Sequence, residues 1–356
     1  ALYRDVRILI LDEPTAVLTP QETDDLFATL RLAIAEGLSI IFISHKLHEV
    51  MAIADRVVVL RHGKMAGGVD TKDTDKDALA AMMMGTEATP PEVSPAKPGV
   101  PLLALRNVTT ADVGSVPGLK SVSLELKAGQ IVGLAGVSGN GQAAMADVVG
   151  GLLNPSDGQV VQGGEAVQKW TPRIAVQSGI ARIPEDRHKT GTIADFDLVE
   201  NAILERYKSP AFSKGGWLNW RKSRAFADGI IEKYDVRCPG SDTPIRLLSG
   251  GNMQKLILGR VLEAGPQIIL ANQPVRGLDI GAVNFVLSQL LTARERGAAV
   301  LLISEDLDEV MALSDVIHVI ADGRLSPEFK RGEMTPAQLG LWMAGQGFET
   351  DIVHAS

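Results

Sequence analysis

The sequence has almost no cysteine, and its charge is not biased toward basic residues. Cys238 is the only cysteine among 356 residues, which excludes a disulfide framework and suits a reducing compartment. Lysine and arginine number 35 against 43 aspartates and glutamates, for a net charge of −8. A general nucleic-acid binder presents a basic face, so the composition argues against that class and against a nucleic-acid partner.

The sequence also lacks a long hydrophobic run. The longest apolar stretches, such as residues 298–303, have the length of a strand and not the about 20 residues that a membrane helix needs. We expect no signal peptide either, because the chain passes from Ala1 almost directly into a candidate strand. Any membrane association is therefore expected to come through a partner.

One segment occurs twice, at a constant offset of 260 residues. The matched positions are Asp12 with Asn272, Glu13 with Gln273, Pro14 with Pro274, Ser44 with Ser304, His45 with Glu305, Asp55 with Asp315 and Gly63 with Gly323. Two carboxylates of the first copy are amides in the second, and one imidazole is a carboxylate. An unbroken offset indicates two homologous domains, of which the second has lost the reactive groups.

The first copy has the pattern of an α/β domain. Residues 8–11 form an apolar run that ends on Asp12, as in a buried parallel strand whose carboxyl end carries a functional residue. Residues 39–44 predict the next strand, which delivers His45 to the same edge of the sheet as Asp12. The two side chains are therefore expected to lie close together.

The chain divides into four parts. Five prolines at positions 90, 91, 95, 98 and 101 predict a short, stiff, solvated linker. The predicted organisation is the C-terminal part of a first domain at 1–85, the linker at 86–101, a complete second domain at 102–345 and a tail at 346–356. Because the second domain has a front part without a counterpart in the first, we expect an N-terminally truncated fragment.

A glycine loop follows the apolar strand expected at 131–135. Its residues include Gly136, Ser138, Gly139, Asn140, Gly141 and Gln142. The backbone N–H groups of such a loop surround a phosphate at a helix N-terminus. The positions that normally hold a lysine and a Ser/Thr hydroxyl carry Gln142 and Ala143. The loop is therefore either a weak, non-hydrolytic nucleotide pocket or a turn that binds nothing.

A second anion site is predicted where Ser249, Gly250 and Gly251 precede a periodic helix. They place backbone donors and one hydroxyl at the positive end of a helix dipole. A lone Ser-Gly-Gly string is often only a flexible turn. This one stands about 20 residues before the strand that matches the strand of Asp12, which makes the signal specific.

These motifs resemble those of the ATP-binding subunit of an ATP-binding-cassette (ABC) transporter with two fused cassettes in one polypeptide. Residues 136–143 resemble the Walker A loop, 8–14 the Walker B strand, His45 the switch histidine and 248–255 the signature motif. The resemblance implies the α/β P-loop NTPase (ABC ATPase) fold in two tandem cassettes, the first incomplete.

The resemblance implies roles for the first-copy residues. Asp12 would orient Mg²⁺ through water, Glu13 would act as base toward the attacking water, and His45 would contact the γ-phosphate of ATP. Ser249, Gly250 and Gly251 would close over that phosphate, which gives one hydrolytic site.

The opposite site would be degenerate. It would combine Gln142 and Ala143 with Asn272, Gln273 and Glu305. An amide is neither a base nor a good ligand for a hard metal ion, so this site cannot hydrolyse ATP by the same route.

Within the family, residues 15–22 and the Ser-Gly-Gly-Asn signature resemble importers of sugars and nucleosides that work with a lipoprotein. Asn272 and Gln273 look more like the nucleoside branch. The resemblance implies an ATP hydrolase, with ATP and Mg²⁺ as cofactors, that energises import of a nucleoside or simple sugar across the bacterial inner membrane. It also implies a place on the cytoplasmic face, with two transmembrane permease subunits and a substrate-binding lipoprotein as partners.

Two alternatives stay open at this point. A soluble two-cassette translation factor would have two competent sites and a long charged helical linker, which the acidic composition and short proline-rich linker disfavour. A non-catalytic scaffold is the other alternative, because no intact Walker lysine occurs in this chain.

Overall fold

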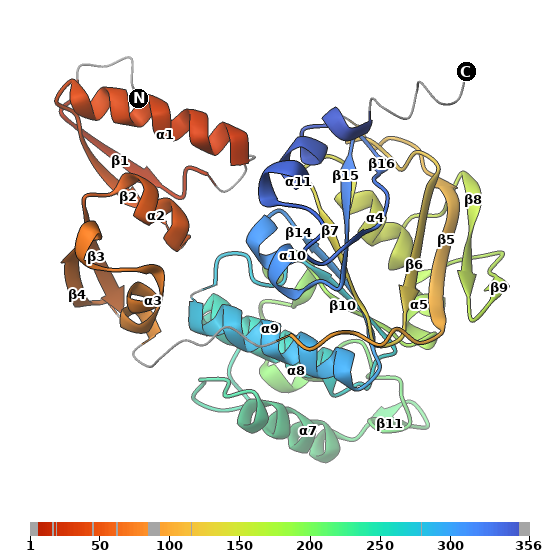
Figure 1. The fold of residues 1–356 in the computed structure, drawn as a ribbon. Coiled ribbons are helices and arrows are strands. Elements are labelled where there is room, and N and C mark those ends of the chain that lie inside the picture. The colour runs from red at the N-terminus through yellow and green to blue at the C-terminus, as the bar shows by residue number, and fades with distance from the viewer. Residues whose placement is uncertain are drawn as a thin grey trace, which may run out of the picture.

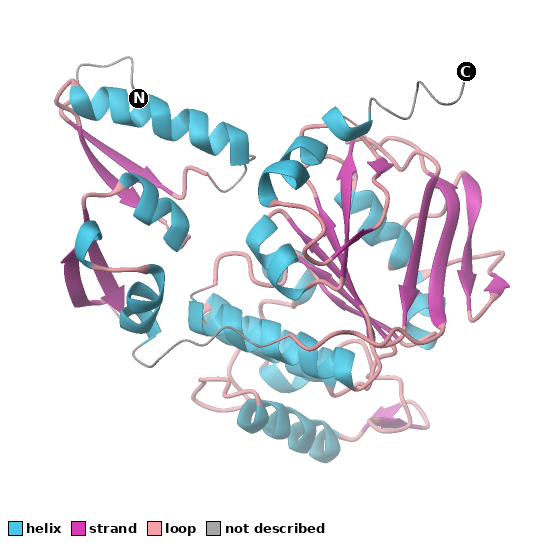
Figure 2. Cartoon of the chain, viewed as in Figure 1, coloured by secondary structure: helices cyan, strands magenta, loops and turns pink. Residues whose placement is uncertain are grey.

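The computed structural model describes residues 6–15, 18, 20–44, 46–61, 63–84, 93–114, 116–278 and 280–348. Figure 1 shows a small N-terminal part, residues 6–84, beside a larger domain, residues 93–348. Both parts combine helices with strands (Figure 2), which confirms the expected α/β class. Within the described ranges, no helix is both long and apolar enough to cross a bilayer.

Strands and helices alternate in the N-terminal part. Its elements are β1 (Ile8–Asp12), α1 (Pro20–Ala35), β2 (Ser39–Ile43), α2 (Leu47–Ile53), β3 (Arg56–Arg61), β4 (Lys64–Asp70), the 3-10 helix η1 (Thr71–Asp73) and α3 (Lys76–Met84). β1 and β2 pair in parallel, with Asp12 opposite Ile43, and β3 pairs antiparallel with β4. The ends of β1 and β2 therefore lie side by side.

The two faces of the β1–β2 pair have different surroundings. Leu9 is buried in a cluster with Phe27 of α1, and the rings of Phe27 and Phe42 meet edge to face at 5.9 Å. Ile8 and Ile10 are exposed on the opposite face. The expectation of a strand buried on both faces is therefore wrong for β1 as described, because alternate residues point to opposite faces and α1 covers only one of them.

Five parallel strands form the centre of the larger domain. The order in the sheet is β10 (Ile180–Ile183), β13 (Ile268–Asn272), β14 (Ala299–Ser304), β7 (Ile131–Ala135), β15 (Val316–Ala321) and β16 (Arg324–Leu325), and β17 (Phe329–Lys330) also pairs with β15. β16 and β17 run antiparallel to β15. Every residue of β7 and β14 is buried, as expected of parallel strands covered on both faces.

The remaining elements surround this sheet. An antiparallel sheet contains β6 (Val122–Lys127), β5 (Pro101–Thr109), β8 (Asp157–Gln162) and β9 (Glu165–Ala166), in that order. The helices are α4 (Gln142–Val149), α5 (Pro172–Gln177), α6 (Leu198–Ile203), α7 (Trp220–Lys233), α8 (Gly250–Leu262), α9 (Ile280–Glu295), α10 (Leu307–Leu313) and α11 (Pro336–Met343). The π-helical turn η2 (Arg187–Gly191), the 3-10 turn η3 (Ile245–Leu247) and the hairpin of β11 (Ser213–Lys214) and β12 (Trp217–Leu218) lie between them.

Alternate residues of the central strands divide the core into two clusters. Ile269 and Leu302 pack in a cluster with α6, α8 and α9. Ile268 and Leu301 pack in another cluster with α4 and the antiparallel sheet. The parallel sheet is thus held from both faces, which fixes the direction in which its strand ends point.

The offset found in the sequence recurs in the secondary structure. β13 begins 260 residues after β1, α9 after α1, β14 after β2, α10 after α2 and α11 after α3. The same order of strands and helices therefore occurs twice in the described chain.

The two parts meet through matched helices. α1 packs against α11, and α3 packs against α9. Because α9 matches α1 and α11 matches α3, a pseudo-twofold rotation exchanges these two contacts. His48 of α2 and its match, Asp308 of α10, form an ion pair with 3.2 Å between Nδ1 and Oδ2, as expected of residues on such an axis.

A buried ion pair joins several segments of the larger domain. The Arg294 guanidinium lies 2.7 Å from Asp315, and the two side chains are 3% and 8% exposed. Asp315 also accepts a hydrogen bond from the backbone N–H of Ile131 at 2.8 Å. Arg294 donates to the carbonyl of Ser94 at 2.8 Å. The pair thus ties α9 to β7 and to the segment before β5.

We expect the change Asp315→Ala to lower the free energy of unfolding by about 3–5 kcal/mol, because it leaves a buried guanidinium without its partner. The matched residue of the first copy, Asp55, is exposed, so Asp55→Ala is expected to cost less than about 0.5 kcal/mol. Urea unfolding followed by circular dichroism measures both. Equal losses in the two variants would contradict the assignment.

The His48–Asp308 contact is expected to depend on pH. It raises the pKa of His48 from 6.5 and lowers the pKa of Asp308 from 3.8. Stabilisation from His48 is complete below pH 6.5 and is lost as the pH rises through its raised pKa; stabilisation from Asp308 is lost as the pH falls through its lowered pKa. Docking of α2 on α10 should therefore be strongest between about pH 4 and pH 6.5.

Both side chains are more than one third exposed, so we expect this contribution to stay below about 1 kcal/mol. Spin labels at Leu32→Cys in α1 and Leu341→Cys in α11, in a Cys238→Ser background, would report the distance between the parts as the pH changes. The same labels in a His48→Gln background should give a distance distribution without this pH dependence. A pH response that persists in that background would locate the switch elsewhere.

Candidate functional site

Asp12 and Glu13 lie at the carboxyl end of β1. The backbone N–H of Glu13 donates to the carbonyl of Ile43 at 2.8 Å, and Glu13 has a φ of 45°. This left-handed conformation is unfavourable for a residue with a side chain and is often found at functional sites. The turn holds the Glu13 side chain at the edge where β1 and β2 end.

The second copy keeps the same turn. Gln273 has a φ of 50°, and its N–H donates to the carbonyl of Ile303 at 2.8 Å. The strained backbone is therefore common to both copies, whereas the side chain is a carboxylate in one and an amide in the other.

His45 lies outside the described residues, so its expected contact with a phosphate stays a prediction. Its neighbours are described: Ser44 follows the end of β2, and Lys46 precedes α2. Since Asp12 is paired with Ile43, Ser44 lies next to the end of β1.

A cavity of about 560 Å³ lies between the two parts of the chain. Residues Glu13, Lys46 and His48 line it from the first part, and Gln273, Glu305 and Asp306 line it from the second. The structure thus brings Glu13 and its counterpart Gln273 to one cavity. Among the described residues that line it, Ser249, Gly250 and Gly251 do not occur, so the expected closure of the signature over the same phosphate is not seen here.

The signature residues lie at the start of α8 in the larger domain. Ser249 is the residue before the helix, and its hydroxyl accepts a hydrogen bond from the Asn252 amide at 3.0 Å. The Arg187 guanidinium donates to the carbonyl of Gly250 at 3.2 Å. A cation beside the N-terminal end of a helix dipole favours an anion, and the anion site expected from the sequence stays a prediction.

Residues 185–187, at the start of η2, connect the signature residues to the turn that follows β13. Glu185 pairs with Arg276 at 2.6 Å, and Arg187 donates to the Arg276 carbonyl. Burial lowers the pKa of Arg187. Asp186 accepts from the N–H groups of His188 and Lys189, which lowers its pKa. Arg187 is a functional candidate that the sequence analysis did not identify. The signal that could have identified it is the charged run Glu-Asp-Arg after Pro184.

The glycine loop keeps the shape of a phosphate loop. Gly139 and Gly141 have φ values of 84° and 112°, a conformation that suits glycine. A Cβ at Gly136 would lie 2.7 Å from the Ile320 carbonyl oxygen. Gln142 is buried, and its amide donates to the Gly136 carbonyl at 2.7 Å. The side chain at the position of the missing lysine is therefore folded back onto the loop.

Ser138 and Asn140 belong to the same glycine loop. Ser138 is exposed. The Asn140 side chain accepts from the N–H of Asp322 at 3.1 Å, and its carbonyl accepts from the N–H of Gly323 at 3.0 Å. Asn140 thus fixes the loop to the turn after β15.

The positions of the second copy that match the expected metal ligands carry side chains that suit Mg²⁺ poorly. A small cavity of about 220 Å³ beside the glycine loop is lined by Ala143, Arg182, Glu185 and Asn272, among others. Magnesium prefers several carboxylate, phosphate or water oxygens in an octahedral arrangement. The methyl group of Ala143 and the amide of Asn272 stand at the two expected ligand positions, although Asp147, Glu185 and Asp186 also line this cavity. Within the described ranges, no group of three or more His, Cys, Asp or Glu side chains could hold a metal ion. The first copy, with Asp12 and Glu13 at one strand end, has the oxygen chemistry that Mg²⁺ prefers.

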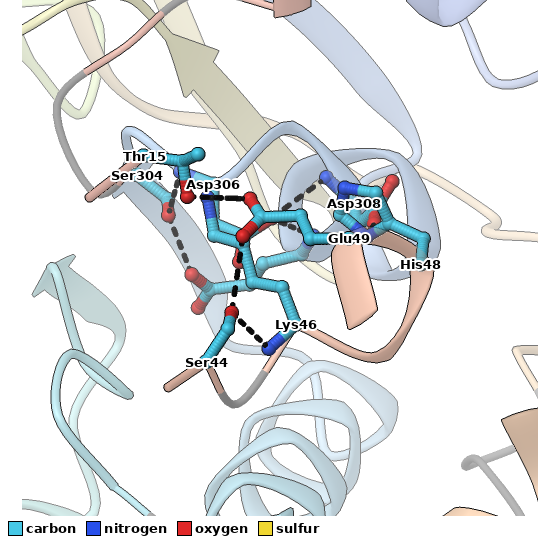
Figure 3. A network of polar contacts seen from close by, with 9 residues as sticks. Thr15, Ser44, Lys46, His48, Glu49, Ser304, Asp306 and Asp308 are labelled. Carbon is cyan, nitrogen blue, oxygen red and sulfur yellow. Dashed lines mark hydrogen bonds and ion pairs between the residues drawn. The ribbon is translucent and has the colours of Figure 1, made fainter. Parts of the chain in front are cut away.

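A buried carboxylate connects the two strand ends of the first copy. Figure 3 shows Glu49 of α2 between Thr15 and Ser44. Thr15 Oγ1 donates to Glu49 Oε1 at 2.6 Å, and Ser44 Oγ donates to Glu49 Oε2 at 3.0 Å. The N–H of Lys46 donates to Ser44 Oγ at 3.0 Å. Sequence reasoning missed this network, although the Ser-x4-Glu spacing is repeated in the second copy.

The second copy contains only half of this network. Ser304 Oγ donates to Glu309 Oε2 at 2.5 Å, and the N–H of Asp306 donates to Ser304 Oγ at 3.0 Å. The position of Thr15 is occupied by Val275. Within the described part of the chain, Glu309 Oε1 has no hydrogen-bond partner. Burial raises the pKa of Glu309 to about 8, so its carboxyl group is mostly protonated at neutral pH.

Comparison with known proteins identifies the class. The family model described as ABC transporter matches residues 119–276. The post-hydrolysis dimer of an ATP-binding cassette bound to ADP and phosphate aligns with a TM-score of 0.56 and 24% identity, over 65% of this chain and 100% of that one. The ADP conformation of an ATP-binding cassette gives a TM-score of 0.55 and 21% identity, over 72% and 100%. The described chain therefore has the fold of an ATP-binding cassette.

Curated relatives narrow the class further. The glucose import ATP-binding protein TsgD13 of Haloferax volcanii is 42% identical over 100% of this chain and 65% of its own length. The guanosine import ATP-binding protein NupO of Bacillus subtilis is 45% identical over 97% of this chain and 68% of its own length. The nucleoside import ATP-binding protein NupA of Lactococcus lactis is 37% identical over 97% and 68%. The chain thus spans about two thirds of the relatives it matches.

The chain belongs to the ABC transporter family. Its relatives include proteins named as glucose, guanosine, nucleoside and ribose import ATP-binding proteins. ATP-binding subunits of ABC importers are ATP hydrolases.

We expect Glu309 to make the stability of the larger domain depend on pH. Its pKa is raised from 4.5 to about 8 in the folded chain, so its contribution is complete below pH 4.5 and is lost as the pH rises through about 8. Glu309→Gln cannot ionise and should remove this part of the loss. Urea unfolding midpoints of both proteins between pH 5 and pH 9 measure it, and parallel pH profiles would contradict the assignment.

Proposed function

We propose that this chain is the nucleotide-hydrolysing component of an importer, with two tandem cassettes, one hydrolytic site and one degenerate site. The observation that carries the proposal is the pair of matched strand ends. They share one strained backbone turn, but one presents Asp12 and Glu13 and the other presents Asn272 and Gln273. A retained geometry with different side chains supports a division of labour between an active and an inactive copy.

In the hydrolytic site, each residue has one task. Asp12 would hold Mg²⁺ through water, and bound Mg²⁺ neutralises charge on the transferred phosphate. Glu13 would accept the proton of the attacking water. Its left-handed turn fixes the direction of its carboxylate at the end of β1. His45 would contact the γ-phosphate.

The signature would contribute the opposite wall of the hydrolytic site. The N-terminal end of α8 supplies backbone donors at Gly250 and Gly251 together with the Ser249 hydroxyl. These groups are suited to a phosphate because they carry partial positive charge and no proton-transfer chemistry. These residues do not line the cavity that contains Glu13, and we propose that the two parts move toward each other when ATP is bound.

In the degenerate site, ATP hydrolysis would need a base and a cation, but the chain has the amides of Gln273 and Gln142 at these positions. The hydrogen bond from Gln142 to Gly136 occupies the loop with its own side chain. This bond favours a second interpretation for this copy alone, a scaffold that stabilises the active copy without binding nucleotide. A soluble translation factor is not favoured, because the relatives are named as import proteins.

The proposed cargo is a nucleoside or a simple sugar. The relatives named for guanosine and nucleoside import, 45% and 37% identical, and the one named for glucose import, 42% identical, support this class without choosing between the two. The proposed partners are two transmembrane permease subunits and a substrate-binding lipoprotein. The proposed place is the cytoplasmic face of the bacterial inner membrane.

We expect Glu13→Gln, in the full-length protein assembled with its permease, to lower ATP turnover by at least ~100-fold, the lower end of general-base catalysis. Phosphate release per mole of protein measures it. Glu36 is exposed after the end of α1, so Glu36→Gln makes the same chemical change away from the site and should leave turnover unchanged. Wild-type turnover in Glu13→Gln would overturn the proposed function.

A further inference from the structure

The Thr15–Glu49–Ser44 network joins the two segments that carry the hydrolytic residues. Thr15 stands two residues after Glu13, and Ser44 stands directly before His45. Glu49 belongs to a third element, α2, and accepts one hydroxyl hydrogen bond at each of its oxygens. One carboxylate thus spans the gap between the two strand ends.

We propose that Glu49 is a positioning residue of the hydrolytic site and that Thr15 and Ser44 are the two contacts through which it acts. The carboxylate holds the segment after Glu13 and the segment before His45 at a fixed separation. This inference rests on the proposed function, because it concerns the geometry of the same site.

Because Glu49 is buried, its carboxylate depends on the hydrogen bonds that it accepts. The Thr15 and Glu49 residues are 2% and 1% exposed, whereas Ser44 is half-buried, so the threonine side of the network is shielded from water. A buried carboxylate is tolerated only when its oxygens are hydrogen-bonded or paired. The Lys46 ammonium, 3.7 Å from Glu49 Oε1, adds a positive charge. A change in either hydroxyl therefore forces the carboxylate, and the segments bound to it, to rearrange.

The second copy provides an internal comparison. There, Val275 stands in place of Thr15, and Glu309 keeps only the serine contact, with its other oxygen unpartnered in the described residues. That copy still folds, with β13 and β14 fully paired. The threonine contact is thus not needed for the fold of this segment. It is lost in the copy that has also lost its carboxylate pair and its histidine, which points to a role in the chemistry.

The network can affect the rate without touching the substrate. Displacement of a reacting group by about 1 Å can cost about 100-fold in rate. Loss of one hydrogen bond at the end of a strand is expected to displace the following segment by less than about 1 Å. We therefore expect a rate loss on the order of 10-fold for one contact and more for loss of the carboxylate charge.

The test compares matched variants of the full-length protein assembled with its permease. ATP turnover per bound nucleotide, and the KM for ATP, are measured for Thr15→Val, which copies the second cassette, and for Glu49→Gln. Thr15→Ser keeps the hydroxyl and is the conservative variant. Glu309→Gln makes the same change as Glu49→Gln in the other copy. Urea unfolding midpoints of all variants show whether each protein is folded under assay conditions.

We expect Thr15→Val to lower kcat about 10-fold and Glu49→Gln about 10- to 100-fold, with KM for ATP changed less than about 2-fold. Thr15→Ser should recover most of the lost rate, and Glu309→Gln should keep wild-type turnover. A structural role alone would not produce this split, because normalisation to bound nucleotide removes unfolded protein from the rate.

Two results would overturn the inference. Wild-type kcat in Thr15→Val and Glu49→Gln, while Glu13→Gln is inactive, would reject the positioning role and leave the proposed function intact. Equal losses in Glu49→Gln and Glu309→Gln would reduce Glu49 to a general structural residue. If Glu13→Gln itself retained full turnover, the proposed function and the inference would both be wrong.

Discussion

The parallel pairing of strands whose carboxyl ends share one edge is the constraint on which the rest of this structure depends. β1 and β2 pair so that Asp12 and Ile43 are opposite each other. In the larger domain, β14 pairs in parallel with both β13 and β7, so the ends of these three strands also share one edge. In the larger domain, burial of alternate side chains on two faces fixes the sheet, so the residue that follows each strand has little freedom in where it lies. Functional side chains are gathered at this edge by the packing of apolar ones.

The two copies show that backbone and chemistry can diverge separately. The left-handed turn at Glu13 recurs at Gln273 with nearly the same φ, although one side chain is a carboxylate and the other is an amide. The strain persists because the hydrogen bond to the neighbouring strand, Gln273 to Ile303, recurs as well. A strained turn can thus be kept by the fold while the side chain that it carries changes from a carboxylate to an amide.

Much of the fold and of the candidate site could be predicted from the sequence, because its signals are local. Apolar runs identify β7 and β13, the glycines identify the loop before α4, and the spacing of Asp12 and Asn272 identifies the repeat. The exposure of one face of β1 could not be predicted. The apolar run at residues 8–11 does not tell which face of the strand other elements cover.

The contacts made by single side chains were beyond the reach of sequence reasoning. Gln142 is recognisable as a replacement for lysine, but its hydrogen bond to Gly136 depends on a rotamer. Glu49 looks like an ordinary helix residue, and only its three-dimensional position between Thr15 and Ser44 sets it apart. Arg187 reaches Gly250, 63 residues away in the chain, through a loop whose path no local pattern encodes.

The matched positions 48 and 308 carry opposite charges where the two parts meet. On a twofold axis a residue faces its own equivalent, so two copies of the first part would set histidine against histidine, and two copies of the second would set aspartate against aspartate. Only the mixed arrangement joins a cation to an anion. One residue on each side therefore discriminates between the correct pairing of the two different parts and the pairing of two identical parts.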